Sequence, residues 1–244
     1  MSQIYETEKS LGEYLLFHYA SSEEILTNDR DWPDGMVQAL GFPVRTVGHF
    51  EATQVARGLD VGCAVGRSTF EMSRHCDFVT GIDFSTAFVT AAEQMRTRGE
   101  IIYRRCDEGM LNSDLTARIP AGIEPARCSF EQGDAMDLSP LLGSFDRVHA
   151  ANLICRLSHP ALFLRRLSEL VKSGGQLVMA TPCTWLEEFT PKPEWPSGST
   201  LDWLKSCLLS SFHLESQVEE AFLIRETARK FQWTLSLTTV WRRH

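Results

Sequence analysis

A glycine-rich turn directly after an apolar segment carries the clearest chemistry in this sequence. In the stretch 58–68 (GLDVGCAVGRS), Asp60 lies two residues before Gly62. A second glycine, Gly66, follows four residues later, giving the spacing DxGxxxG. Glycines let the backbone turn tightly and let a ligand approach it closely. The dinucleotide pattern GxGxxG instead places a pyrophosphate against a helix N-terminus. A carboxylate ahead of the turn suits an ammonium group, so we expect a nucleotide-like ligand with a cationic part.

Two more aspartates follow apolar runs further along the chain. Asp83 comes directly after the run 78–82, where its carboxylate can accept both hydroxyl protons of a ribose. Asp134 follows the run 127–131. Each aspartate alone is as consistent with a helix cap, but the ordered set of three elements favours a nucleoside-containing ligand. After a fourth run come Asn152 and Arg156, which either belong to the same site or cap the strand and face solvent.

The elements that would position these residues alternate along the chain from about 57 to 181. Apolar runs predict strands, and amphipathic stretches between them predict helices, which is typical of a doubly wound parallel sheet. The expected strands are 58–61, 78–82, 127–131, 147–151 and 176–180, and the expected helices are 66–75, 86–98 and 159–171. After a helix near 200–211, strands 212–219 and 233–241, joined by 222–232, would add an antiparallel pair. The fold class is therefore Rossmann-like α/β, with seven strands and an antiparallel last strand.

Two segments lie outside this alternation. Residues 7–20 predict an amphipathic helix that could cover the site, so we expect residues 1–50 to form a helical lid segment and 51–244 the main domain. The stretch 99–126 is long for an α/β connection and contains two prolines and a glycine. It is either a functional or partner-binding excursion or a variable surface loop.

Bulk properties restrict the class of protein. The 244 residues include 43% hydrophobic and 23% charged side chains, the mix of a globular chain. A formal charge of −8 argues against a nucleic-acid partner, and the absence of a long apolar run argues against a membrane partner. Seven scattered cysteines without a CxxC pair fit reduced thiols, which predicts a cytoplasmic location. Since carboxylates and histidines form no evident cluster, we expect no metal.

The three aspartate elements resemble the motifs of class I methyltransferases, which use S-adenosylmethionine. The resemblance implies that Asp60 and the glycine turn hold the methionine part, that Asp83 holds the ribose, and that Asp134 with the next amide recognises adenine. The residues implied in cofactor binding are Asp60, Gly62, Cys63, Ala64, Gly66, Asp83, Phe84, Ser85, Asp134, Ala135 and Asn152. No DPPY or NPPY segment follows the fourth strand, which argues against the exocyclic amino methyltransferases of nucleic acids and protein glutamine.

Longer segments resemble the mercaptohistidine N-methyltransferases of ovothiol biosynthesis. These segments are residues 5–7 and 13–19 near the N-terminus, residues 150–157, residues 224–233 and residues 239–243. The likeness therefore spans nearly the whole chain. In that family the domain commonly forms the C-terminal part of a sulfoxide synthase. The resemblance therefore implies a free-standing form of the domain, with a separate synthase as the partner that supplies 5-thiohistidine.

The implied reaction is methylation of the imidazole nitrogen nearer the side chain, giving ovothiol A and S-adenosylhomocysteine. Because sulfur is the softer nucleophile, the pocket must fix the ring, with a cation and an anion holding the amino acid group. Arg225 and Glu226 are the first choices for these roles, followed by Arg156 and Asn152. Alternatively, Arg225 and Glu226 form an exposed ion pair at the surface. Tyr14 and His18 either cover the ring or merely pack. The alternatives are another small-molecule N- or S-methyltransferase, a non-catalytic cofactor-binding module, and a nicotinamide oxidoreductase.

Overall fold

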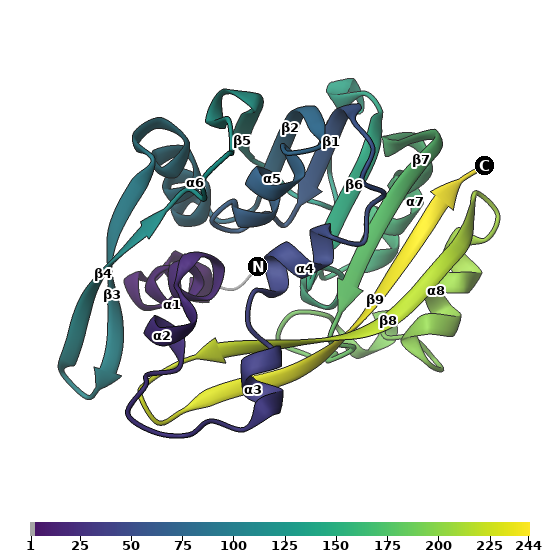
Figure 1. Ribbon diagram of the computed structural model, residues 1–244. Coiled ribbons are helices and arrows are strands. Elements are labelled where there is room, and N and C mark those ends of the chain that lie inside the picture. The colour runs from purple at the N-terminus through teal and green to yellow at the C-terminus, as the bar shows by residue number, and fades with distance from the viewer. Residues whose placement is uncertain (1–2) are drawn as a thin grey trace.

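A seven-stranded sheet forms the centre of the molecule in the computed structural model, which describes residues 3–244 (Figure 1). Its strands are β1 (Val55–Val61), β2 (Cys76–Asp83), β5 (Cys128–Gln132), β6 (Phe145–Ala151), β7 (Val171–Thr181), β8 (Phe212–Arg225) and β9 (Phe231–Arg243). They lie in the order β5-β2-β1-β6-β7-β9-β8. The first five are parallel, whereas β9 is antiparallel to both β7 and β8. The predicted Rossmann-like fold with its antiparallel closing strands is confirmed.

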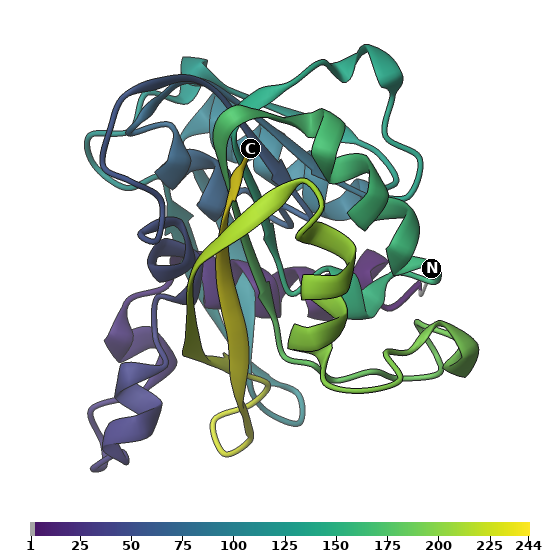
Figure 2. The same ribbon diagram turned by 90° about the vertical axis from the view of Figure 1, so that its right-hand side faces the viewer.

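Helices cover both faces of the sheet, because side chains along each strand alternate between the two faces. On β7, Leu177 and Met179 pack in one core cluster with α7 (Pro160–Leu170) and α8 (Thr200–Leu208). Val178 between them packs with Met72 of α5 (Arg67–Met72) on the opposite face. The same face carries α6 (Thr86–Arg98), whose apolar side chains join those of α5 (Figures 1 and 2).

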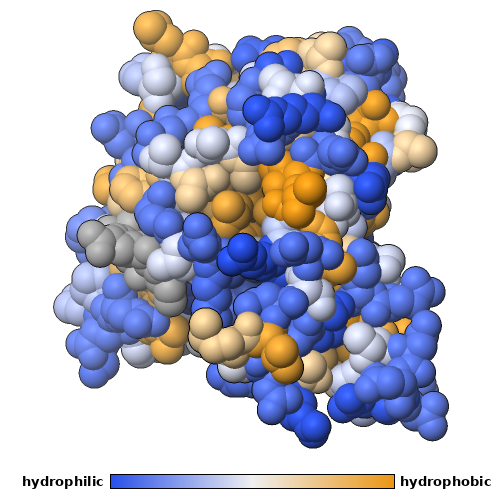
Figure 3. Space-filling model, turned by 90° about the vertical axis from the view of Figure 1, so that its left-hand side faces the viewer, coloured by the Kyte–Doolittle hydropathy of each residue, from blue (hydrophilic) through white to orange (hydrophobic). Residues whose placement is uncertain are grey.

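Most of the stretch 99–126 is a β-hairpin, and residues 119–124 form an irregular connection after it. The hairpin consists of β3 (Glu100–Glu108) and β4 (Leu111–Arg118), which pair with each other as a separate two-stranded sheet. Ile101 and Tyr103 are buried, whereas Ile102 between them is 73% exposed, the period of two expected for a strand with one covered face. The hairpin also leaves Met110 and Leu111 exposed at its turn. Apolar and polar side chains are interspersed over the side of the molecule that Figure 3 shows.

Four short helices precede β1. They are α1 (Glu8–Tyr19), α2 (Ser22–Ile25), α3 (Asp34–Gln38) and α4 (Phe42–Val47). Short 3-10 helices in the described part of the chain are Gln3–Glu6, Pro125–Arg127, Pro140–Leu142, Ile154–Arg156 and Lys192–Glu194. The predicted N-terminal helix is present as α1, which lies between the β3–β4 hairpin and the far end of β8 and β9 (Figure 1). Among residues 3–244 no helix combines the length and apolar character that crossing a membrane requires.

The last two strands are longer than predicted. The stretch 222–232, expected to join them, begins in β8 and ends in β9, and the chain reverses between Arg225 and Phe231. This turn reaches the β3–β4 hairpin, where the backbone amide of Ala228 donates to the carbonyl of Asp107 at 2.9 Å. The extension brings the end of β8 beside α1.

We predict that Gly12→Ala destabilises the protein by about 1–3 kcal/mol, since a Cβ there overpacks a close contact. That Cβ would lie 2.5 Å from the carbonyl oxygen of Arg104 in β3. Gly35→Ala is the matched control, because it is also helical and its Cβ would meet nothing closer than 4.0 Å. It should stabilise by up to about 1 kcal/mol through helix propensity. Denaturant unfolding of both variants measures the difference; equal effects would contradict the tight packing of α1 on β3.

Candidate active site

A cavity of about 600 Å³ lies at the carboxyl ends of β1, β2 and β6, under α1. One side, here called the motif wall, comes from the turns after the parallel strands and includes Gly62, Asp83, Ser85, Gly133 and Ala135. The other side, the aromatic wall, comes from α1, α4 and β8 and consists of Tyr14, Phe17, His18, Phe42 and Phe222. Ligands of open α/β sheets bind at this edge, so the fold places a candidate site where the sequence predicted one.

The glycine turn uses its two glycines differently. Gly62 lines the cavity and has a left-handed φ of 76°. Ala64, two residues further on in the same turn, also has a positive φ, of 47°. Gly66 also has a positive φ, of 88°, but it does not line the cavity. A Cβ there would lie 2.8 Å from the ring of Phe130, so the glycine permits packing between the turn and β5.

Asp60 lies beneath the cavity and does not line it, contrary to the role expected for it. The residue is 1% exposed, and its Oδ2 accepts a hydrogen bond from Thr69 Oγ1 at 2.7 Å. Its Oδ1 lies 2.8 Å from Nδ1 of His149 on the neighbouring β6, and both oxygens are thus engaged inside the protein. We therefore no longer assign Asp60 a direct contact with an ammonium group. His149 is buried, as expected of a core histidine, yet it contributes to the cavity floor.

Asp83 points into the cavity from the end of β2. Its Oδ2 accepts from the amide of Ala64 at 2.8 Å, and its Oδ1 accepts from the amide of Ser85 at 2.9 Å. Burial raises the pKa of Asp83 to about 6, although these two amide hydrogen bonds oppose the rise. Because each carboxylate oxygen can accept more than one hydrogen bond, both remain able to bind a pair of ligand hydroxyls.

Of the remaining residues predicted to bind the cofactor, most line the cavity and one does not. Cys63, Phe84, Ser85 and Ala135 line the cavity. Asp134 is not among the lining residues, and its Oδ1 accepts from the amide of Met136 at 2.9 Å, which caps the local turn; its contact with adenine stays a prediction. Gly133 lines the cavity beside it, and a Cβ there would lie 2.8 Å from Ile82.

Asn152 and Arg156 both line the cavity after β6. Asn152 has a left-handed φ of 54°, and its Oδ1 accepts from Ser236 Oγ of β9 at 2.7 Å. The Arg156 guanidinium lies 4.7 Å from the ring centroid of Phe189 and donates to the carbonyl of Thr184. Arg156 thus brings a positive charge to the cavity, and the same side chain contacts the loop after β7.

Tyr14 and His18 face the cavity from consecutive turns of α1. Their rings stack with centroids 5.9 Å apart. Burial, together with the charge of Arg67, lowers the pKa of His18 to about 3, so its imidazole is neutral at physiological pH. Burial raises the pKa of Tyr14 far above its usual value, so the phenol keeps its proton.

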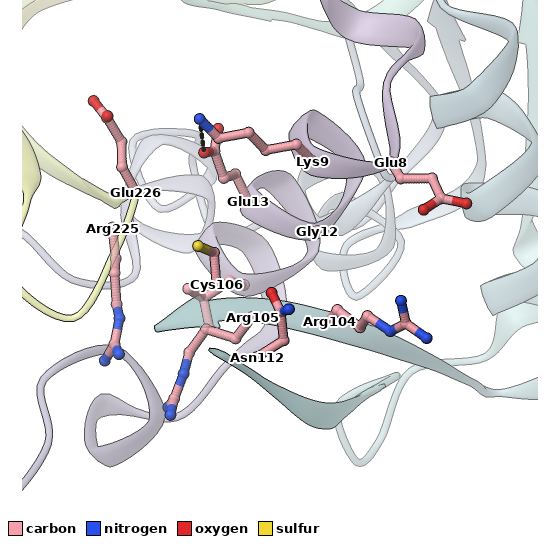
Figure 4. A pocket seen from close by; sticks show the side chains of 11 residues that line it. Glu8, Lys9, Gly12, Glu13, Arg104, Arg105, Cys106, Asn112, Arg225 and Glu226 are labelled. Atoms are coloured by element: carbon pink, nitrogen blue, oxygen red, sulfur yellow. Dashed lines mark ion pairs between the residues drawn. The ribbon is translucent and has the colours of Figure 1, made fainter. Parts of the chain in front are cut away.

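Arg225 and Glu226 do not line this cavity, contrary to the roles predicted for them. Because Arg225 belongs to β8, its side chain points away from the face on which Ile224 lines the cavity. Its guanidinium donates to Asp107 at 2.8 Å and to the carbonyl of Ile25 at 2.9 Å. Both residues line a second pocket of about 270 Å³ between α1, the β3–β4 hairpin and the end of β8 (Figure 4).

Sequence reasoning missed several cavity residues. Glu13 and Phe17 share the face of α1 that carries Tyr14, and this helical spacing could have revealed them. Phe42, Phe189 and Phe222 come from segments without a local motif. Among residues 3–244, no group of three or more histidine, cysteine or acidic side chains is arranged to hold a metal ion.

We predict that Asp83→Asn weakens binding of S-adenosylhomocysteine, the ligand that the motifs imply, by roughly tenfold or more, because charge-assisted hydrogen bonds to the ribose are lost. Calorimetry should also show that the wild-type affinity falls as the pH drops through about 6, where Asp83 takes up a proton. The variant should lack this pH dependence. Asp137→Asn, an exposed carboxylate outside the cavity, is the control. An unchanged affinity in Asp83→Asn would place the ribose elsewhere.

Solved structures share this fold at low sequence identity. The N-methyltransferase NodS from Bradyrhizobium japonicum WM9, in complex with S-adenosyl-L-homocysteine, is 16% identical with a TM-score of 0.52, covering 96% of this chain and 98% of that one. The [4+2]-cyclase SpnF is also 16% identical, with a TM-score of 0.58 over 98% of this chain and 94% of that one. At such identities the likeness establishes the fold alone.

Two curated proteins are related in sequence, both tRNA U34 carboxymethyltransferases. The protein from Actinobacillus succinogenes is 27% identical over 78% of this chain, and that from Proteus mirabilis is 26% identical over 79%. The chain spans about half the length of these relatives, 55% in each case. A methyltransferase domain family matches residues 59–179, which contain the motif wall. Taken with the strand order, this match shows that the chain belongs to the class I S-adenosylmethionine-dependent methyltransferases.

Proposed function

We propose that this protein methylates 5-thiohistidine on the imidazole nitrogen nearer the side chain, giving ovothiol A. One observation carries the proposal. The segments 13–19, 150–157 and 224–233, which resemble the mercaptohistidine N-methyltransferases, lie far apart in the sequence and yet all contribute side chains to the same cavity. A chance likeness would have no reason to converge on one site.

The motif wall fits S-adenosylmethionine. Asp83 offers oxygens to the ribose hydroxyls, and Gly62 and Gly133 line the cavity on the same wall. When bound, this cofactor would supply an electrophilic methyl group on a sulfonium: the nucleophile bonds to the methyl carbon from the side opposite the sulfur, the carbon–sulfur bond breaks, and S-adenosylhomocysteine is the leaving group. The protein residues then have to orient the acceptor and exclude water.

The aromatic wall suits a flat heterocyclic acceptor. Phe17, Phe42 and Phe222 pack against one another with ring centroids 5.1–6.1 Å apart. A ring thiolate spreads its charge into the imidazole, so a nitrogen lone pair is available near neutral pH without a strong base. Positioning must then favour nitrogen over the softer sulfur.

His18 is suited to hold the thiolate away from the methyl donor. Its Nδ1 is buried and makes no hydrogen bond. We assign the ring proton to Nε2, because a proton on Nδ1 would bury an unpaired N–H, which costs free energy. A neutral imidazole can therefore donate one hydrogen bond from Nε2 to the sulfur without adding charge to the cavity.

Carboxymethyl transfer to tRNA is the second candidate, favoured by the sequence likeness to the two carboxymethyltransferases. Two features favour the small acceptor over it. The formal charge is −8, which opposes association with a phosphate backbone. In addition, α1 covers the cavity and lines it along one side.

We predict that the protein with S-adenosylmethionine and 5-thiohistidine forms a product methylated on the ring nitrogen, identified by mass spectrometry with fragmentation. Histidine should give no product, because it lacks the thiolate that the pocket recognises. Unmodified tRNA offered with the same methyl donor, or with its carboxymethyl analogue, should also give none. Methylation on sulfur, or turnover of tRNA alone, would contradict the assignment.

A further inference from the structure

We propose that Glu13 binds the α-ammonium group of the acceptor and thereby selects amino acids over other imidazoles. This inference rests on the proposed function, since it concerns the acceptor in the same cavity. It replaces Glu226, the anion expected from the sequence, with a carboxylate one helical turn before Phe17.

The position of Glu13 is favourable for this role. It lines the cavity on the side of β8 and β9, where Ile224 and Gln232 also contribute. It lines the second pocket as well, and among the described residues it is the only one that the two hollows share (Figure 4). Glu13 therefore stands in the partition between them, at the edge of the aromatic wall.

One oxygen of the Glu13 carboxylate has no hydrogen-bond donor among the described residues, although Lys9 forms a long ion pair with it (Figure 4). Its Oε1 is buried and makes no hydrogen bond. The ammonium of Lys9 lies 3.7 Å away, too far for a hydrogen bond, and the Lys9 side chain is 68% exposed. Burial raises the pKa of Glu13, which means that its charged form is poorly solvated. A cation arriving in the cavity would supply the missing hydrogen bonds.

The other glutamates near the cavity already have hydrogen-bond donors or are exposed to solvent. Glu6 accepts from the amides of Thr86 and Ala87 at 3.1 and 3.2 Å, capping α6. Glu226 lies 2.6 Å from Lys230 Nζ, accepts from Gln232 at 2.7 Å, and lines the second pocket alone. Glu188 also lines the cavity, but it belongs to the loop after β7 and is exposed to solvent. Glu13 is thus the carboxylate beside the aromatic wall that has a buried oxygen without a hydrogen bond.

A zwitterionic acceptor would find both charges in this cavity. Arg156 supplies the cation for its carboxylate, and Glu13 supplies the anion for its ammonium. The faces of Tyr14 and Phe17, which lie with ring centroids 6.5 Å apart, add a favourable surface for an ammonium group. The imidazole can then lie along the aromatic wall, with the amino acid group fixing its orientation.

The test compares Glu13→Gln with wild type on two acceptors, 5-thiohistidine and its desamino analogue, which keeps the ring, thiol and carboxylate. Glu8→Gln is the matched control, because it makes the same change on the same helix at an exposed residue outside the cavity. Glu13→Gln should raise KM for 5-thiohistidine roughly ten- to hundredfold, the range expected for a charge-assisted hydrogen bond. KM for the desamino analogue and the affinity for S-adenosylhomocysteine should stay unchanged. Equal effects on both acceptors, or none on either, would overturn the inference.

Calorimetry separates this inference from the proposed reaction. With S-adenosylhomocysteine bound, the wild type should bind 5-thiohistidine more tightly than the desamino analogue, and Glu13→Gln should remove that difference. If the difference is found but no ring-methylated product forms, the reaction is wrongly assigned and the role of Glu13 stands. If the product forms while Glu13→Gln leaves the binding difference intact, the role of Glu13 is refuted and the reaction stands.

Discussion

The buried contact between Asp60 and His149 is the interaction on which the site depends most. It joins β1 to β6, while Thr69 ties the same carboxylate to α5. The other ring nitrogen of His149 lies 3.1 Å from Thr46 Oγ1, which anchors α4. Since α4 carries Phe42 of the aromatic wall, one polar chain sets the distance between that wall and the glycine turn. Polar groups buried this deeply are tolerated only when their partners are in place, so the chain also fixes one arrangement of these elements.

Sequence reasoning located the sheet because its signals are local. Apolar runs ending at Asp83 or at the glycine turn reveal a strand and the edge where a ligand binds. It could not show that Asp60 and Asp134 have internal partners, for a physical reason: a carboxylate after a strand can accept from a ligand or from an internal donor, and the packing of Thr69, His149 and Met136 is a tertiary property. Arg225 was misplaced because the strand pairing of its segment, which sets the direction of every side chain, is a long-range property.

The division of the cavity mirrors a division of the chain. The motif wall lies within 59–179, the part matched by the methyltransferase family, whereas the aromatic wall comes from segments before and after it. A fold of this kind also serves the cyclase SpnF, so the sheet alone does not determine the reaction. Under the proposed function, the aromatic side chains that contact the acceptor come from the flanking segments, whereas Arg156 lies within the matched part.

The absence of a side chain at Gly12 has a mechanical consequence. It lets α1 lie directly on the backbone of β3, and the turn between β8 and β9 is tied to the same hairpin through Asp107. Helix, hairpin and turn are thus joined along the side of the cavity. If the cavity opens on this side, the three elements have to move together, as a collective motion of the microsecond-to-millisecond class.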